Sequence, residues 1–238
     1  MADLHFIGGE KGGVGKSFVA RTLIQYLLDR DLACTLFEAD RSNPDLARIY
    51  GKILPCQFAV FSEGERYEDT ANKVFETAIE NRVLVNLPAQ VFPAMKKWYA
   101  DNELFEVAAE EGVKIALWFV VDGGYDSLTL LAKSLDFYDA GVRHIIVRNW
   151  GRGDFEDWEA VLAQPENTRL KTLIAERSSS IIDCPKFIGT VERNTIDAES
   201  LTFATAREDT SRFSAISRQR VKKFLRGAYA EFDKAGAF

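Results

Sequence analysis

Short apolar runs alternate with amphipathic stretches along the whole chain. The runs are nearly uninterrupted by polar residues, which is typical of strands that are buried on both faces. They predict strands at 4–7, 33–39, 56–61, 82–87, 113–121 and 144–149. Apolar residues at helical spacing predict helices at 16–29, 69–79, 93–109 and 126–135. This alternation predicts an α/β fold with a mostly parallel, twisted sheet and helices on both faces.

The composition is that of one folded domain. The chain has 238 residues, of which 47% are hydrophobic, and no repeat or long linker divides it, so we expect a single domain over 1–238. Three cysteines in no metal-binding spacing, and no basic-then-apolar leader, predict a cytoplasmic protein. No apolar run reaches the roughly 18 residues that span a bilayer. A net charge of -6 argues against a generally basic, nucleic-acid-binding surface.

A glycine-rich loop, GGEKGGVGKS at 8–17, follows the first predicted strand. The usual phosphate-binding loop has Gly, four residues and then Gly-Lys-Ser/Thr. Here Glu10 stands where the first glycine is expected. The remaining glycines let backbone N–H groups approach phosphate oxygens, and the start of the next helix adds a positive field. Lys16 can pair with the β and γ phosphates and Ser17 can bind Mg²⁺, so the loop predicts a Mg²⁺-nucleotide site rather than a bare turn.

A second lysine, Lys11, lies inside this loop. With it, the segment KGGVGKS resembles the deviant Walker A motif of the ParA/MinD superfamily of P-loop ATPases. Partition ATPases of that family often have a polar residue where Glu10 stands. The resemblance implies a P-loop NTPase fold, and it implies that Lys11 crosses a dimer interface to the partner's nucleotide in an ATP-bound homodimer. It also implies catalytic roles for Lys11 and Lys16, and nucleotide contacts from Gly12, Gly13, Val14, Gly15, Lys16, Ser17 and Phe18.

Other positions extend the resemblance. Asp40, which ends FEAD, matches an aspartate that lies near the Mg²⁺ and the attacking water, so a catalytic and water-mediated metal role is implied. Asn149 in IIVRN matches an asparagine that contacts adenine, which favours ATP over GTP. CPKFIGTVERN at 184–194 resembles the late strand and nucleotide-side loop, with Glu192 where many members have proline. Turn or cap roles are the alternatives for Asp40 and Asn149.

The segment VLVNLPAQV is similar to the Walker B segment of the family, but Asn86 stands where an aspartate is usual. An asparagine keeps an acceptor oxygen and lacks the negative charge that strengthens a metal's water shell. We therefore expect a weak, water-mediated metal contact at Asn86 and slow or partner-dependent hydrolysis, with Asn86→Asp faster than the wild type. Asp122, in VDGGYD, either substitutes for the missing aspartate or forms a turn.

A final amphipathic helix is predicted at 209–232. Its apolar face comprises Phe213, Ile216, Val221, Phe224, Leu225, Ala228 and Phe232, and its basic face comprises Arg212, Arg218, Lys222, Lys223 and Arg226. The helix either packs on the sheet with a solvated charged face, or presents that face to DNA phosphates, or meets lipid. Membrane binding is less favoured because the apolar face has no Trp. With few residues before the first strand we expect no helix-turn-helix, and any DNA binding should not read sequence.

The resemblance implies an ATPase that acts as a switch. ATP assembles a homodimer, the dimer binds DNA or another scaffold, and an unidentified stimulating or cargo protein triggers hydrolysis. Partition of plasmids or chromosomes and plasmid mobilisation are the natural settings. Two alternatives stay open: an ATP-binding assembly module with little hydrolysis, and a MinD-like positioning ATPase on a membrane. A metabolic ligase is less favoured because no second-substrate site is visible, and His5 and His144 lie in predicted strands, where core positions are expected.

Overall fold

A parallel β-sheet forms the centre of the protein. The computed structural model describes residues 2–62, 64 and 68–238, and in these residues the sheet has seven strands in the order β3-β2-β4-β1-β5-β6-β7. Every pair of neighbouring strands is parallel. The strands are β1 (Asp3–Gly8), β2 (Thr35–Glu38), β3 (Cys56–Phe58), β4 (Arg82–Asn86), β5 (Lys114–Val121), β6 (Arg143–Asn149) and β7 (Ser180–Cys184).

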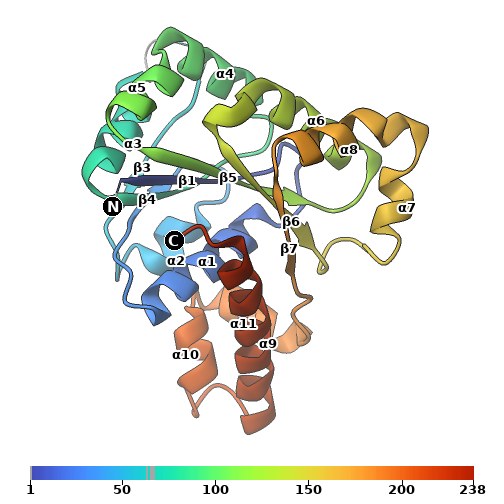
Figure 1. Cartoon of the computed structure of the whole chain (residues 1–238). Helices are drawn as coiled ribbons and strands as arrows, with labels where there is room; N and C mark the ends of the chain where they lie inside the picture. The colour runs from blue at the N-terminus through green and yellow to red at the C-terminus, as the bar shows by residue number, and fades with distance from the viewer. Residues whose placement is uncertain (1, 63, 65–67) are drawn as a thin grey trace.

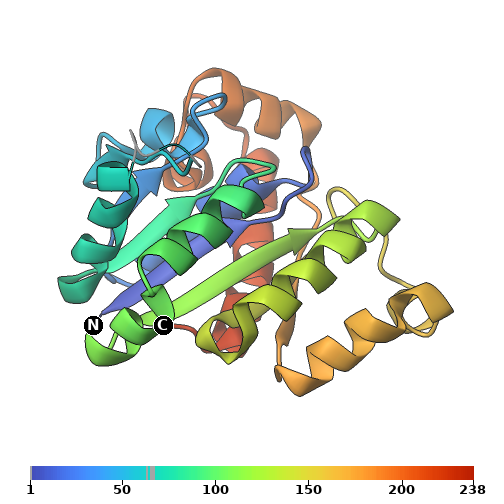
Figure 2. The same cartoon turned by 90° about the horizontal axis from the view of Figure 1, so that it is seen from above.

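Helices cover both faces of this sheet, as Figures 1 and 2 show. On one face lie α1 (Lys16–Asp29), α2 (Asp45–Tyr50), α9 (Thr190–Ala198), α10 (Phe203–Glu208) and α11 (Ala215–Ala235). On the other lie α3 (Glu68–Glu80), α4 (Phe92–Asp101), α5 (Leu104–Glu110), α6 (Tyr125–Tyr138), α7 (Trp158–Leu162) and α8 (Thr168–Glu176). Successive side chains of a strand point to opposite faces, so Phe6 enters one hydrophobic cluster and Ile7 the other. The predicted α/β architecture is confirmed.

Three predicted elements differ in the structure. The single helix expected at 93–109 is two helices, because Glu103 adopts a left-handed conformation with φ of 47° and ends the regular path. The strand expected at 56–61 ends at Phe58, since its neighbour β2 ends at Glu38 and leaves nothing to pair with. The late strand is β7, which ends at Cys184 where the segment 184–194 begins.

Helix α11 begins later and ends later than the predicted 209–232. The Asp209 carboxylate accepts the N–H groups of Ser211 (2.8 Å) and Arg212 (3.2 Å), which holds this segment in a turn. Ser214 then caps the helix by accepting the N–H of Ser217 at 3.1 Å. The prediction was wrong at Ile216, which is 68% exposed, because it lies five residues before Val221 and so about 140° around the helix from it.

The apolar face of α11 is used inside the protein. Val221, Phe224, Leu225, Ala228 and Phe232 are buried in the cluster that α11 forms with α1, α10 and the sheet. Lys222, Lys223 and Arg226 remain exposed, whereas Arg212 pairs with Asp209 and Glu199. Within the described ranges, no helix combines the length and apolarity needed to cross a membrane.

Both histidines are buried, as predicted. His144 lies on β6, with Nε2 2.9 Å from the Ser134 hydroxyl and Nδ1 3.2 Å from the Val142 carbonyl oxygen. Burial lowers the pKa of His144 to about 4 and that of His5 to about 3. Both rings are therefore held neutral in the folded protein.

Stability should depend on pH through His144. Its pKa in the folded protein lies below the ordinary 6.5, so the contribution of the neutral ring is complete above pH 6.5 and is lost as the pH falls toward 4. Between pH 7 and pH 5 we expect the free energy of unfolding to fall by about 2 kcal/mol more in the wild type than in His144→Gln. Urea denaturation of both proteins at the two pH values measures this. Equal losses would mean that His144 titrates normally in the fold.

Candidate nucleotide-binding site

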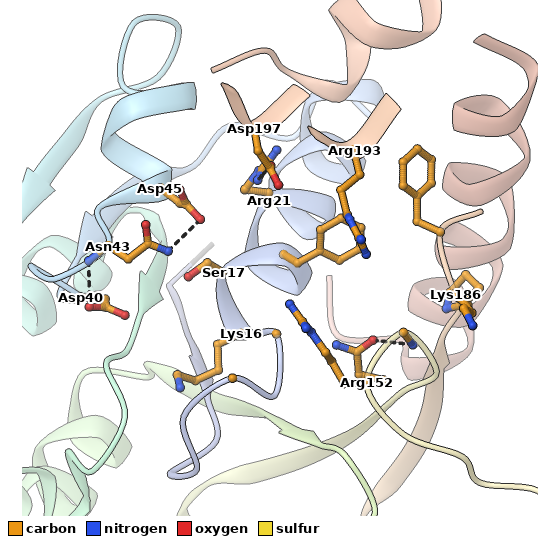
Figure 3. Close-up of a pocket in the computed structure, with 17 residues that line it drawn as sticks. Lys16, Ser17, Arg21, Asp40, Asn43, Asp45, Arg152, Lys186, Arg193 and Asp197 are labelled. Carbon is orange, nitrogen blue, oxygen red and sulfur yellow. Dashed lines mark hydrogen bonds and ion pairs between the residues drawn. The ribbon is translucent and has the colours of Figure 1, made fainter. Parts of the chain in front are cut away.

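The glycine-rich loop joins β1 to α1 at the carboxyl edge of the sheet, and a pocket of about 430 Å³ opens beside it (Figure 3). Among the residues predicted for the site, Gly13, Gly15, Lys16, Ser17, Phe18, Asp40 and Asn149 line this pocket. Lys11, Gly12, Val14 and Asn86 do not line it. Val14 and Asn86 are buried next to the pocket wall, whereas Gly12 is exposed and Lys11 half-exposed. The fold thus brings most of the predicted residues to one place.

Asn149 holds the loop in shape. Its side-chain amide donates to the Val14 carbonyl oxygen at 2.7 Å, and its side-chain oxygen accepts the N–H of Gly151 at 3.0 Å. Gly15 lies against the same amide and has φ of 95°, a conformation that favours glycine. A Cβ at Gly15 would come within 2.3 Å of the Asn149 amide nitrogen. The predicted contact of Asn149 with adenine stays a prediction, but the structure adds a role in fixing the loop.

Gly15→Ala should disrupt both the backbone and this hydrogen bond. The left-handed conformation alone costs about 1–3 kcal/mol for a non-glycine residue, and the collision with Asn149 adds to it. Gly112→Ala is the matched control, because Gly112 has φ of 68° and open space around its Cβ position. We expect Gly15→Ala to lower the melting temperature more than Gly112→Ala and to lose ATP binding, measured by calorimetry. Equal effects of the two changes would rule out the collision.

Lys16 and Ser17 form the first turn of α1. Lys16 is buried, its ammonium group lies 3.3 Å from the Lys11 carbonyl oxygen, and burial lowers its pKa while Asp40 and Glu10 act in the opposite direction. An ammonium held so deep beside exposed backbone N–H groups is suited to a phosphate chain, which supplies the missing negative charge. In Figure 3 the Lys16, Ser17 and Asp40 side chains lie along one side of the pocket.

Glu10, the residue in place of the first glycine, ties the loop to α4. Its carboxylate accepts the N–H of Phe92 at 2.9 Å, and its carbonyl oxygen accepts the N–H of Gln90 at 3.1 Å. Phe92 is the first residue of α4, where a negative charge is favourable. Burial raises the pKa of Glu10, and this hydrogen bond and Lys16 oppose that rise. The substitution is therefore integrated into the fold.

Lys11 forms an ion pair within its own chain. Its ammonium group lies 2.7 Å from the carboxylate of Asp122, which follows β5. The other carboxylate oxygen accepts the N–H of Gly124 at 3.0 Å, so Asp122 also shapes the turn. The hydrogen bond to Asp122 raises the pKa of Lys11, and the pKa of Asp122 is lowered even though its burial acts in the opposite direction. Asp122 therefore combines the predicted turn role with a contact to Lys11 that the sequence did not reveal.

A buried carboxylate lies beneath Ser17. Glu38, at the end of β2, accepts a hydrogen bond from the Asn86 amide at 2.9 Å, and the same amide lies 3.3 Å from the Ser17 hydroxyl. Burial raises the pKa of Glu38 to about 7. Asp40, two residues along, accepts N–H groups of its own loop from Ser42 and Asn43. Glu38 was not among the predicted site residues, because its role depends on which strand lies beside β2.

These residues fit a magnesium ion. The Asn86 side-chain oxygen is buried next to Ser17 and has no hydrogen-bond partner among the described residues, so it is suited to accept from a metal-bound water. Ser17 offers a hydroxyl ligand, and Asp40 offers a carboxylate from the pocket wall. Hydroxyl, amide and carboxylate oxygens are the donors that Mg²⁺ prefers.

Several pocket residues were missed from the sequence. Arg152, Lys186 and Arg193 bring positive charge to the side of the pocket opposite Lys16 (Figure 3). Arg21, on α1, is buried and pairs with Asp197 of α9 at 2.6 Å. Arg21 lies one helical turn beyond Ser17, so helical spacing could have indicated it, and Lys186 and Arg193 belong to the segment 184–194 that the resemblance gave as the late strand and nucleotide-side loop. The excess of positive charge suits a polyanionic ligand.

Comparisons with known proteins agree with this geometry. No family model matches the chain. Protein MobD of Acidithiobacillus ferrooxidans is 27% identical over 182 residues, which are 76% of this chain and 77% of MobD. Protein TraL of Escherichia coli is 26% identical over 249 residues, covering 99% of both chains. The MinD cell division protein of Aquifex aeolicus has the same fold, with a TM-score of 0.50 and 13% identity over 94% of this chain and 96% of that one.

A parallel sheet carries a glycine-rich loop with Lys11 and Lys16 at its central edge, and the loop opens into a basic pocket suited to a nucleotide and Mg²⁺. Two relatives align with this chain over most or all of its length. The chain is thus similar over most or all of its length to MobD and TraL, and it has the fold of the MinD cell division protein.

Proposed function

We propose that the protein is a ParA-like ATPase that works as an ATP-dependent dimerisation switch, in plasmid partition or mobilisation. It is a single nucleotide-binding domain that acts in the cytoplasm. The observation that carries the proposal is the second loop lysine, Lys11, whose side chain is 36% exposed at the mouth of the loop. A cation placed there can reach a nucleotide held by a second copy of the chain.

The residues around the pocket have separate roles in binding ATP and Mg²⁺. The loop N–H groups from Gly12 to Ser17 and the Lys16 ammonium bind the phosphate chain. Ser17 holds the metal, with Asp40 and Asn86 acting through water. A Mg²⁺ ion held by these residues would supply positive charge next to the phosphates. Asp40 orients the attacking water, and Phe18 and Asn149 lie along the nucleotide.

The Lys11–Asp122 ion pair gives the switch a resting state. While Lys11 is bound to Asp122 of its own chain, it is not available to a partner's nucleotide. Dimerisation on ATP would exchange this contact for one with the partner's phosphates, which carry more negative charge. Hydrolysis, stimulated by a cargo or activating protein, would remove that attraction and return Lys11 to Asp122.

Nonspecific DNA is the scaffold that we propose for the dimer. Lys222, Lys223 and Arg226 are exposed on α11, and they would contact phosphates without reading bases. Membrane binding through α11 is less favoured, because its apolar residues are buried against α1, α10 and the sheet.

Sedimentation of the wild-type protein with an arbitrary labelled duplex tests the proposal. We expect a dimer that carries the duplex in Mg²⁺-ATP, a monomer in Mg²⁺-ADP, and loss of DNA binding as salt is raised. A dimer without DNA would keep the switch and remove the scaffold. A monomer in both nucleotides would contradict the switch.

A second candidate is an ATP-binding assembly module with little hydrolysis, and Asn86 is the observation that favours it. Phosphate release by the ATP-bound dimer separates the two functions. Phosphate release that becomes faster when a partner protein is added supports the switch. A dimer that releases no phosphate and retains bound ATP during the assay supports the assembly module.

A further inference from the structure

Glu38 and Asn86 face each other across two strands. They are register partners in the parallel pair β2 and β4, and both side chains are fully buried. The Asn86 amide donates to the Glu38 carboxylate at 2.9 Å and lies 3.3 Å from the Ser17 hydroxyl. One amide group thus connects a buried carboxylate to the residue that is suited to hold Mg²⁺.

The remaining contacts fix the orientation of Glu38. One carboxylate oxygen also accepts the N–H of Asp40 at 3.0 Å, and the other accepts the N–H of Leu46 at 3.0 Å. Only a carboxylate offers acceptors on both sides, because a glutamine would turn its NH₂ group toward one of these donors. The position therefore requires an acid, and the acid in turn requires a donor at position 86.

This pairing sets the direction of the Asn86 amide. With its NH₂ group held by Glu38 and Ser17, the Asn86 oxygen is left as a buried acceptor without a partner in the part of the chain that the structure describes. An acidic residue at position 86 would put two carboxylates within hydrogen-bond distance in a buried site, where like charges repel strongly. The site has room for one carboxylate, and this chain carries it on β2.

We propose that Glu38 is the positioning residue of the Mg²⁺-ATP site: it places on β2 the single acidic group that the resemblance puts on β4, and through the Asn86 amide it fixes the direction of the Asn86 oxygen. Asn86 is then an exchanged partner rather than a lost acid. The proposal deepens the proposed function and rests on the binding of Mg²⁺-ATP at this pocket. It reverses the expectation from the sequence alone that Asn86→Asp would improve the site.

The test is whether the effect of Asn86→Asp changes sign with residue 38. The proteins are the wild type, Asn86→Asp, Glu38→Gln and the double variant, and the readout is the affinity for a fluorescent ATP analogue with Mg²⁺ and with EDTA. The gain from Mg²⁺ is the ratio of the affinity measured with Mg²⁺ to the affinity measured with EDTA. We expect each single change to reduce this gain by about tenfold or more. In the Glu38→Gln background, Asn86→Asp should increase that gain, because a single carboxylate is restored.

Two outcomes would overturn the proposal. One is an Asn86→Asp protein with Mg²⁺-dependent affinity equal to or above that of the wild type. The other is a double variant no better than Glu38→Gln alone. Losses that are equal with Mg²⁺ and with EDTA would show a structural role only, which also contradicts it.

Stability without ligand separates this inference from the proposed function. If the wild type binds no ATP analogue, the proposed function fails. Urea denaturation of the ligand-free proteins still tests the pairing of Glu38 with Asn86. Asn86→Asp should destabilise the wild type and stabilise Glu38→Gln. If Asn86→Asp alone does not fold, Glu38→Gln must rescue its folding, and absence of rescue would overturn the pairing.

Discussion

Lys16→Ala is expected to weaken the binding of ATP by up to roughly a hundredfold. The Lys16 ammonium is buried beside the loop. Its loss removes a positive charge that a phosphate chain would meet there. Hydrogen bonds to charged groups are worth about 1.5–3 kcal/mol, so the Kd should rise by up to roughly a hundredfold. Calorimetric titration with Mg²⁺-ATP measures the change.

The folded state of Lys16→Ala provides the control. Burial disfavours the charged form of Lys16, so its removal should leave the melting temperature of the nucleotide-free protein unchanged or higher. Lys16→Arg keeps the charge and replaces a compact ammonium by a larger planar group, and we expect it to bind ATP weakly as well. A Kd for Lys16→Ala within a few-fold of the wild type would place the phosphates elsewhere.

Lys11→Ala is expected to abolish the ATP-dependent dimer while the monomer still binds nucleotide. Lys11 does not line the pocket of its own chain, so the affinity of the monomer for ATP should change little. Across a dimer interface, by contrast, the loss removes one cation from each of the two nucleotide sites. Analytical ultracentrifugation in Mg²⁺-ATP, together with calorimetry under conditions that keep the protein monomeric, measures both effects.

Asp122→Asn is the matched variant for Lys11. An asparagine keeps the oxygen that accepts from Gly124 and loses the charge that holds Lys11, so the turn should persist while the lysine is released. We expect this variant to form the dimer at lower protein concentration than the wild type. If Lys11→Ala dimerises normally, Lys11 has no part in assembly, and if Asp122→Asn has no effect, the ion pair with Asp122 does not restrain Lys11.

Local signals in the sequence were enough for the elements that hold the pocket. The helix at 16–29 was predicted with the bounds that α1 has, because the loop glycines and the apolar spacing both act within a few residues. Lys16 and Ser17, which the loop motif singled out, line the pocket, and their binding of phosphate and Mg²⁺ stays a prediction. In these cases the chemistry of a residue is determined by its neighbours in the chain.

Features that depend on distant parts of the chain were missed. FEAD was interpreted through Asp40, but the role of Glu38 depends on the register of β2 against β4, which lies more than forty residues away. The Lys11–Asp122 pair joins residues 111 positions apart. The early start predicted for α11 had another cause, since helical periodicity continued across a segment that Asp209 folds into a turn.

The contact between Glu10 and α4 means that this phosphate-binding loop is not an interchangeable module. In a loop with glycine at that position, the backbone can hold its shape without side-chain support. Here the loop shares two hydrogen bonds with the segment from Gln90 to Phe92, so its shape is encoded in two separate parts of the sequence. A graft of 8–17 into another P-loop protein would need a matching helix start, and sequence changes in 90–92, which follow β4, are constrained by a loop that follows the neighbouring strand β1.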